Sequence, residues 1–384
     1  MKSSSCLILI VALVLVFQVH SSALPKFASR TGAKCQSCHI NPTGKGMRSE
    51  FGSTYSRDEI TLPTFKGLTD YEDITNTISP SLSFGADFRS VFYHETQDNA
   101  NTFFQMQGAL YFDIRLNKKF RIFVDKDLYN GFEVFGLAKV LPLDGYVKVG
   151  KFIPAYGTKV DDHNYFIRGG PYNAGAQFAG KFPAGYPAGL RFGELSEDTG
   201  IELGFAPSIF TFSAGLFDGV PGTSLPTSST KNKSFALRGD ARFKVEGINL
   251  NLGGSYYDSP TAIDRQAFYG AFGAITVFDN LTLTSEMDFV EHARPGTSTT
   301  VGIMWWHELN WMVYQGIDLK VAYESYDPDK DLANGIFSQV TVGAELFVLS
   351  GVELRPLYRF NINSIPNIGD TNTNEFLMMF HFFL

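Results

Sequence analysis

From Ile78 to Leu384 the chain repeats segments in which apolar and polar residues alternate one by one, and clusters of Gly, Asn, Asp and Pro separate these segments. In segment 317–324 the odd positions are Ile, Leu, Val and Tyr, while the even positions are Asp, Lys, Ala and Glu. Segments 281–289 and 352–363 divide in the same way. Alternation with a period of two is typical of strands with one apolar face, so this region predicts an all-β domain.

Two architectures suit such strands. In a soluble sandwich the apolar face lies inward, whereas in a membrane barrel it faces lipid and the polar face lines a wet lumen. The barrel is favoured because the strands are about ten residues long, as a tilted membrane strand requires. No hydrophobic run of helical length follows Ala23, so any membrane span must consist of strands. The composition agrees, since 15 % of the residues are aromatic, 37 are Gly and only 18 % are charged. We therefore expect a transmembrane antiparallel β-barrel of about 16 strands over residues 78–384.

The turns support a barrel with two unlike ends. Tight turns at 143–145 and 279–280 alternate with longer loops at 161–187 and 218–233. Bacterial barrels have short periplasmic turns and long outer loops, and an even number of strands returns both termini to the same side. The final segment places apolar residues on one face up to the last residue: Phe376, Met378, Phe380, Phe382 and Leu384.

This ending resembles the closing strand of bacterial outer-membrane proteins, although Leu384 stands where an aromatic residue is common. The stretch Gly-Lys-Phe-Ile-Pro-Ala-Tyr-Gly at 150–157 resembles the corresponding part of phosphate-selective porin-like proteins. The resemblance implies the barrel architecture, and we do not extend it to phosphate selectivity.

Residues 1–23 have the pattern of a secretory signal peptide. Lys2 carries the only early charge, residues 7–17 are almost entirely apolar, and Ser21 and Ala23 are small residues suited to cleavage. The apolar core is shorter than the roughly 20 residues that a membrane-spanning helix needs. The net charge of −7 and the pI near 5.5 argue against nucleic acid as a partner. These features predict an exported protein located in the outer membrane, with lipid around the barrel.

The segment 24–77 between the signal peptide and the barrel contains Cys35-Gln-Ser-Cys38-His39. Cys-x-x-Cys-His is the spacing that attaches a c-type haem, because the thiols bind the haem vinyl groups and the histidine ligates the iron. Once the signal peptide with Cys6 is removed, Cys35 and Cys38 are the only cysteines. We therefore predict one covalent heme c, with Cys35 and Cys38 as the attachment sites and His39 as the proximal iron ligand.

Other interpretations of the motif have weaker support. A zinc site needs a fourth ligand and spaces its ligand pairs across a loop. A dithiol redox motif usually belongs to a thioredoxin-like unit, and nothing of that unit surrounds these cysteines. A chance occurrence of the motif or a structural disulfide is the remaining alternative.

The residues around the motif, 27–48, resemble short monohaem cytochrome c segments that precede barrels in exported bacterial proteins. By that resemblance the iron would have a second axial ligand, which tunes its reduction potential. Met47 is a candidate distal ligand, and His163 is the next candidate. His94, His292, His307 and His381 are expected at lumen or interface positions. An open sixth site is a further alternative.

We expect a protein that carries out electron transfer at the cell envelope through a haem on the periplasmic side. The segment is too small to shield a haem alone, so the barrel or a partner should contribute burial. One haem cannot carry electrons across about 30 Å of hydrocarbon, so a periplasmic or extracellular redox partner, such as another cytochrome, is expected. The alternative is a porin-like diffusion channel in which the haem is structural, gating or sensory. No distal His and Arg pair near the motif indicates a peroxidase, so no enzyme activity is expected.

Overall fold

The computed structural model describes residues 25–65, 75–96, 99–128, 131–160, 165–168, 190, 192, 196–219, 233–260, 265–293, 296, 298–332, 335–365 and 369–384. The predicted signal peptide, residues 1–23, and His163 lie outside the described residues.

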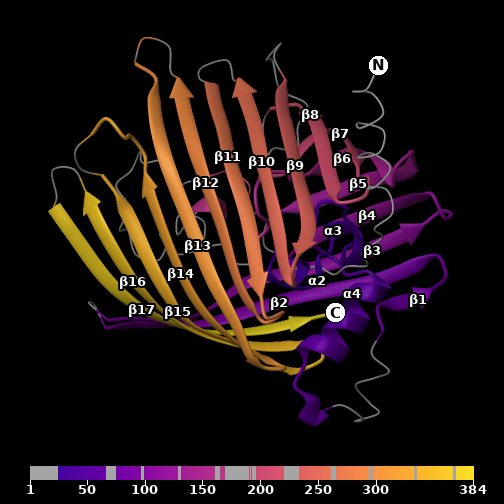
Figure 1. Ribbon diagram of the computed structural model, residues 1–384, viewed down its shortest axis with the longest axis horizontal. Coiled ribbons are helices and arrows are strands. Elements are labelled where there is room, and N and C mark those ends of the chain that lie inside the picture. The colour runs from indigo at the N-terminus through magenta and orange to yellow at the C-terminus, as the bar shows by residue number, and fades with distance from the viewer. Residues whose placement is uncertain are drawn as a thin grey trace.

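Sixteen long antiparallel strands of the described chain form one closed barrel (Figure 1). Each strand pairs with its neighbours in sequence, and β2 (Leu82–Glu95) pairs with β17 (Gly369–Phe383) to close the sheet. A short strand, β1 (Thr77–Ser79), adds to β2. The other strands are β3 (Ala100–Arg115), β4 (Phe120–Asp127), β5 (Phe132–Leu141), β6 (Gly145–Phe152), β7 (Asp198–Phe205), β8 (Phe210–Phe217), β9 (Ser234–Val245), β10 (Ile248–Pro260), β11 (Arg265–Val277), β12 (Leu281–Ala293), β13 (Thr300–Tyr314), β14 (Ile317–Asp327), β15 (Phe337–Leu349) and β16 (Val352–Ile365). The predicted fold class and strand number are confirmed.

The two ends of the barrel differ as the turn chemistry predicts. After every odd-numbered strand from β3 to β15 the chain turns within a few residues, as at 142–144 and 278–280. One of the two-residue turns is Glu246-Gly247, where both residues have positive φ angles, 48° and 86°, as a type I′ hairpin turn requires. The connections at the opposite end include the long stretches 153–197 and 218–233. Because β2 starts and β17 ends at the short-turn end, the chain enters and leaves the barrel there.

The strands turn their polar faces into the lumen. On β14 the side chains of Asp318, Lys320 and Glu324 are 1–3 % exposed, whereas Leu319, Val321 and Tyr323 on the other face are 41–49 % exposed. On β16 the buried inward residues include Arg355 and Arg359, and Ile362 lies outside. A soluble sandwich would bury the opposite face, so the prediction of a barrel with an apolar outer surface is confirmed.

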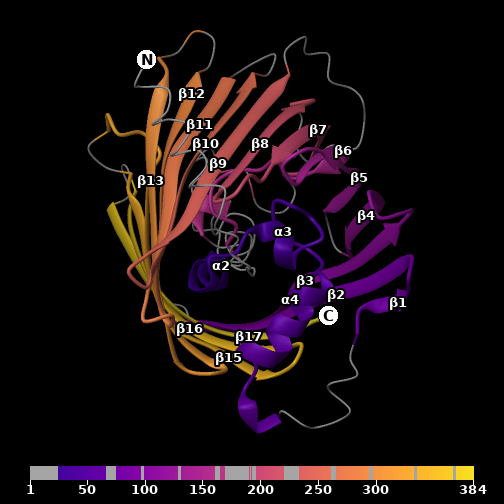
Figure 2. The same cartoon turned by 45° about the vertical axis from the view of Figure 1, so that its right-hand side comes forward.

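The N-terminal segment, residues 25–65, lies inside and at the short-turn end of the barrel, with α2 and α3 surrounded by strands in Figure 2. Its elements are α2 (Pro25–Thr31), α3 (Cys35–Cys38), α4 (Glu50–Tyr55), the π-helix η1 (Ser56–Ile60) and the 3₁₀-helix η2 (Pro63–Phe65). We call residues 25–65 the lumen segment. Within the described residues, no helix has the length and apolar character needed to cross a bilayer.

Polar contacts fasten the lumen segment near the rim of the barrel. Asn249 donates to the Arg30 carbonyl at 2.8 Å, and Thr276 Oγ1 donates to Ser29 Oγ at 2.8 Å. Further out, Gln315 in the β13–β14 turn donates to the carbonyls of Asp58 and Thr61. Residues such as Asn249 and Thr276 stand next to the strand ends that lead into short turns, so this segment occupies the short-turn half of the lumen.

The connection between β6 and β7 also enters the lumen, with the 3₁₀-helix η3 (Phe166–Arg168) in its described part. The Tyr156 hydroxyl donates to Asp288 at 2.8 Å and the Tyr165 hydroxyl to Glu308 at 2.9 Å. The Phe166 amide donates to Glu324 at 2.7 Å. Two segments therefore fill the lumen together.

Apolar packing in the lumen follows the inner wall. The rings of Phe123, Phe135, Phe152 and Phe217 follow one another across β4, β5, β6 and β8 with centroids 5.2–5.8 Å apart. Met47 of the lumen segment joins the same cluster. The barrel thus has a packed apolar strip across β4 to β8, and buried apolar and charged side chains together line the rest of its interior.

Candidate functional site

The two cysteines of the motif lie on the short helix α3, Cys38 buried and Cys35 half-buried. The His39 amide donates to the Cys35 carbonyl at 3.0 Å, and the chain then becomes extended at His39 (φ −115°, ψ 147°). No disulfide bond joins the thiols. The helical turn followed by an extended histidine brings both thiols and the imidazole to one short stretch of chain, so the arrangement suits the predicted attachment chemistry.

His39 is oriented by a backbone contact. Its Nδ1 donates to the Gly46 carbonyl at 3.3 Å, because a carbonyl oxygen can only accept. The turn that supplies this carbonyl contains Gly44 and Gly46, both at positive φ angles of 87° and 68°. Histidines that ligate metals usually donate one ring N–H to a carbonyl or carboxylate and bind the metal through the other nitrogen. The contact therefore occupies Nδ1 and leaves Nε2 as the nitrogen that the predicted iron ligation would use.

Met47 lies on the other side of this stretch of chain. His39 pairs with Arg48 in an antiparallel bridge, and the Ile40 amide donates to the Met47 carbonyl at 3.1 Å. Since successive side chains of extended chain point to opposite faces, Met47 and Ile40 face away from His39 and Arg48. The Met47 side chain is fully buried against the barrel wall, where its Cγ packs beside Gly85 of β2. The arrangement does not favour Met47 as the distal ligand, and that assignment stays a prediction.

Cys35 and His39 open onto a cavity in the lumen. Its empty volume of about 1420 Å³ includes space that is open to solvent. Its apolar lining includes Ile153, Phe192, Phe272 and Phe383. The lining comes from the lumen segment, from the β6–β7 connection and from strands on several sides of the barrel. The cavity therefore adjoins the motif and is enclosed by several parts of the chain.

Positive charge dominates the cavity. The lining includes seven Lys and Arg residues but only two carboxylates, Asp87 and Glu353; the cations are Lys45, Arg48, Arg89, Lys159, Arg168, Arg238 and Arg242. Arg242 contacts the motif, with Nη2 4.0 Å from Cys35 Sγ. The same guanidinium donates to the Ala33 carbonyl and pairs with Asp240 at 3.1 Å. Lys45, Arg89, Arg168 and Arg238 also pair with carboxylates, so these ion pairs offset much of the positive charge. The guanidinium groups still provide donors suited to a ligand with carboxylates or phosphates.

Several buried polar atoms of the cavity lining lack hydrogen-bond partners among the described residues. They are Gln107 Oε1, Thr158 Oγ1, Arg168 Nε, Arg242 Nε and His381 Nε2. Buried polar groups are nearly always satisfied in folded proteins, so such a group of orphaned atoms indicates a place for a polar or charged ligand.

Lys159 is a further unusual cation in this lining. Its ammonium contacts the Pro154 carbonyl at 3.5 Å, a weak hydrogen bond. Burial is the main cause that lowers the pKa of Lys159 to about 7. The nearby positive charges of Arg168, Lys45 and Lys148 lower this pKa further, whereas Glu133 raises it. An anion bound in the cavity would favour the charged form of this lysine.

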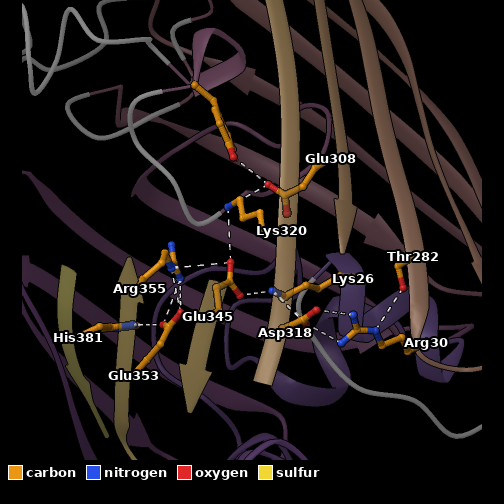
Figure 3. Close-up of polar contacts among 11 residues, drawn as sticks. Lys26, Arg30, Thr282, Glu308, Asp318, Lys320, Glu345, Glu353, Arg355 and His381 are labelled. Carbon is orange, nitrogen blue, oxygen red and sulfur yellow. Dashed lines mark hydrogen bonds and ion pairs between the residues drawn. The ribbon is translucent and has the colours of Figure 1, made fainter. Parts of the chain in front are cut away.

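Ion pairs connect the lumen segment to the wall beside the cavity, as Figure 3 shows. Arg30 forms a two-bond contact with Asp318 at 2.8 and 3.0 Å, and Lys26 pairs with both Asp318 and Glu345. From Glu345 the network continues across β15, β16 and β17 through Arg355 and Glu353 to His381. All these groups are nearly inaccessible to solvent. The lumen segment is therefore held by buried charges of the wall.

The predicted site residues thus fall into two groups. Cys35 and His39 line the cavity, Cys38 is fully buried next to them and is not part of the lining, and Met47 lies in the wall cluster. His381 was expected at a lumen or interface position and lines the cavity, whereas His307 is on the outer face. Arg242 and Lys159 were not singled out from the sequence. Alternation could have placed Arg242 on the lumen face, but only the folded barrel brings it next to Cys35. Within the described part of the chain, no group of three or more His, Cys, Asp or Glu is arranged to hold a metal ion.

No family model and no curated protein matches this chain. Solved structures match its fold. The outer-membrane protein OmpT of Vibrio cholerae matches with a TM-score of 0.56 at 14 % identity, over 81 % of this chain and 100 % of that one. Pseudomonas putida OprB matches with a TM-score of 0.56 at 13 % identity, over 86 % of this chain and 100 % of the other. An anion-selective porin from Comamonas acidovorans matches with a TM-score of 0.54 at 10 % identity, over 79 % and 99 %. The chain therefore has the fold of porin-like outer-membrane β-barrels.

Proposed function

We propose that this protein carries one covalently attached c-type haem inside an outer-membrane barrel and transfers electrons at the cell envelope. The observation that carries the proposal is the position of the Cys35–His39 motif at the edge of a large cationic cavity within the lumen. An ordinary diffusion channel has no need of a cysteine pair followed by histidine at such a place.

The residues around the cavity fit a haem. Cys35 and Cys38 would each add an S–H across a vinyl group, the sulfur bonding to one carbon and the proton going to the other. His39 would bind the iron, oriented by the Gly46 carbonyl. The cations of the lining match the propionate carboxylates, and the apolar residues match the ring faces. Once bound, the haem would supply a one-electron iron couple.

The outer surface supports a location in the outer membrane. Large apolar side chains are exposed on neighbouring strands, among them Leu203, Phe212, Leu237, Leu252, Ile275, Leu283, Trp305, Leu309 and Val321. A contiguous apolar surface of this kind is unusual for a soluble protein and suits contact with lipid. The similarity in fold to outer-membrane barrels points the same way.

The position of the motif suggests where a partner acts. The lumen segment occupies the short-turn half of the barrel, and short turns face the periplasm in bacterial barrels. A periplasmic cytochrome could then exchange electrons with the haem at the short-turn end. Since the hydrocarbon layer is about 30 Å thick, exchange with the outside needs a second redox group or a small carrier that enters the lumen from the long-loop end.

The alternative is a porin-like diffusion channel with a structural, gating or sensory haem. The cationic cavity and the similarity in fold to an anion-selective porin favour this reading for small anions. Against it, the lumen segment and the β6–β7 connection both occupy the interior. Planar-bilayer conductance separates the two functions: a low conductance that is independent of haem redox state supports electron transfer, and a large anion conductance supports the channel.

A pyridine haemochrome spectrum tests the proposal directly. The full chain is produced in a host with a c-type haem maturation system and extracted from outer membranes. We expect one haem per chain that resists acid–acetone extraction, reduced reversibly by a periplasmic cytochrome. Folded barrel without haem would contradict the proposal. Haem that exchanges no electrons with any periplasmic or external donor would contradict its electron-transfer part.

A further inference from the structure

We infer that His381 is the second axial ligand of the haem iron, on the side opposite His39. This inference rests on the proposed function and names a residue that completes the site. It follows from four observations: the place of His381 in the cavity, the contact of its Nδ1, the state of its Nε2, and its connection to His39.

His381 is on the lumen face of β17 and is only 3 % exposed. It is flanked in register by Glu353 of β16 and Arg89 of β2, and all three line the same cavity as His39. Because these neighbours belong to a closed sheet, the backbone of His381 is fixed by hydrogen bonds on both sides. The imidazole therefore lies on a rigid element, as a ligand position requires.

The Nδ1 atom of His381 donates to Glu353 Oε2 at 2.7 Å, a contact drawn in Figure 3. Glu353 is in turn held by Arg355 at 2.8–3.1 Å. A carboxylate on one ring nitrogen is the usual second-shell partner of a metal-binding histidine, since it fixes the tautomer and makes the other nitrogen a better ligand. His39 and His381 thus share one feature. In each, the contact with a neighbouring oxygen uses Nδ1, so Nε2 is the nitrogen that would bind the iron.

The Nε2 atom of His381 is buried and lies within ion-pair distance of Asp87, but the angle of this contact falls short of hydrogen-bond geometry. Asp87 Oδ1 is 3.2 Å away, but the Asp87 carboxylate already receives two hydrogen bonds from Arg89, at 2.9 and 2.8 Å. A buried ring nitrogen left without a hydrogen bond is costly. Coordination to iron would satisfy this nitrogen while Arg89 continues to neutralise Asp87.

The side chain of His39 is directed toward the part of the cavity that His381 also lines. Its side chain shares a face with Arg48, the bridge partner of His39. The Arg48 guanidinium lies 3.9 Å from the centroid of the Phe383 ring, and that ring lies 4.8 Å from the His381 ring. The contacts from Arg48 through Phe383 to His381 therefore connect the two histidines across one part of the lumen.

Other candidate ligands fit less well. Met47 faces the wall, and His307 lies on the outer face, where it accepts or donates a hydrogen bond with Ser285 at 3.0 Å. Lys159 lines the cavity, but it lies beside the 41–46 turn, where its Cγ is 3.8 Å from the position of a Cβ at Gly44. The same Cβ position is 3.6 Å from Cys35 Sγ, so Lys159 lies on the Cys35 side of the motif, whereas Phe383 connects His381 to Arg48, the bridge partner of His39. Two histidine ligands also predict a lower reduction potential than a histidine–methionine pair.

The test uses the full, haem-loaded chain extracted from outer membranes. The variants are His381→Ala, His381→Met, Met47→Leu and, as a matched histidine control, His307→Ala. Haem content is measured as the pyridine haemochrome, which is independent of the native axial ligands because pyridine replaces them. Spin state is read from absorption and electron paramagnetic resonance spectra, ligand access from carbon monoxide binding, and the reduction potential from a spectroscopic titration.

We expect low-spin iron in the parent chain. His381→Ala should keep the full haem content, become high-spin and bind carbon monoxide, and added imidazole should restore the low-spin spectrum. His381→Met should stay low-spin with a more positive potential, which also tests the inference if the alanine variant does not fold. Met47→Leu and His307→Ala should match the parent.

Two results overturn the inference while the proposed function stands. One is a haem-loaded His381→Ala barrel that remains low-spin and excludes carbon monoxide. The other is loss of the low-spin spectrum in Met47→Leu. A parent barrel that folds but contains no covalent haem overturns the proposed function itself, so the two failures are distinguishable.

Discussion

The barrel wall and the lumen segment are built on different principles. The wall pairs every strand with two neighbours and separates apolar from polar residues by simple alternation. The lumen segment has only short helices, and side-chain bonds hold it to the wall, such as Arg30 to Asp318 and Asn249 to the Arg30 carbonyl. The wall therefore depends on backbone hydrogen bonds, whereas the position of the segment depends on a few buried charges.

This difference indicates a division of roles. Backbone ladders tolerate many side-chain changes, so the wall should fold with or without an intact haem motif. Buried ion pairs tolerate few changes, because removing one partner leaves an uncompensated charge. The segment that carries Cys35, Cys38 and His39 is thus the part of the molecule most sensitive to single substitutions.

Removal of both thiols should give the largest effect. Cys35→Ser combined with Cys38→Ser eliminates the nucleophiles that form thioether bonds, so we expect complete loss of covalent haem. The wall should be unaffected, because neither residue belongs to a strand. Haem staining after denaturing electrophoresis measures the loss, and the faster migration of unheated sample measures barrel folding. Loss of the folded band in the variant would contradict the separation of roles.

The next largest effect should come from the anchor of α2. Asp318→Asn removes the carboxylate shared by Arg30 and Lys26 and leaves two buried cations undercompensated. We expect the segment to be less stable in the lumen by about 3–5 kcal/mol. Protease cleavage of the segment and an increase in ion conductance measure the change.

The matched control is Asp331→Asn. Asp331 pairs with Lys330 at 2.8 Å, but its side chain is 71 % exposed. Exposed ion pairs contribute about 0–1 kcal/mol, so this variant should behave like the parent. Equal protease sensitivity of the two variants would show that the buried pair does not anchor the segment.

A charge on the outer face should destabilise the barrel wall and leave the lumen segment unchanged. Val321 is near the middle of β14 and 49 % exposed. Val321→Arg should lower the stability of the barrel in lipid vesicles by about 2–4 kcal/mol, because the charge faces hydrocarbon. Urea unfolding followed by tryptophan fluorescence measures this, with Val321→Ile as control. Haem per folded barrel should not change, and a midpoint equal to that of the control would exclude lipid contact at this position.

The smallest effect should come from the cap that joins α3 to α4. Ser49 Oγ accepts from the Gly52 amide at 3.2 Å and donates to the Ser37 carbonyl at 2.7 Å. Ser49→Ala removes this N-cap and should cost about 1 kcal/mol in the segment alone. Thr54→Ala, an exposed change inside α4, is the control. Amide hydrogen exchange over residues 35–55 should rise only for Ser49→Ala, and the strands should exchange as in the parent.

Much of the wall could be predicted from sequence. In β14 the alternation of Leu319 and Val321 with Asp318 and Lys320 predicted both the strand and its two faces. The turn at 278–280 and the long connection after β6 were also predicted from Asp, Asn and Gly. Such features are local, because side-chain direction along a strand and the conformation of a turn depend on adjacent residues.

The candidate site could be predicted only in part. The Cys-x-x-Cys-His motif identified Cys35, Cys38 and His39 as site residues, because these three residues are close together in the sequence. Nothing local distinguished His381 from the other histidines. Its pairing with Glu353 spans 28 residues and its contact with the cavity depends on closure of the barrel between β17 and β2.

The sequence by itself determined that this chain forms strands with one apolar face, that it places a cysteine pair and a histidine ahead of them, and that its turns are short at one end. Each of these properties follows from neighbouring residues. Only the tertiary structure decided that the motif lies inside the barrel and that Arg242 and His381 share its cavity. Those positions depend on closure of the sheet and on buried ion pairs between residues hundreds of positions apart, such as Arg30 and Asp318 with a separation of 288.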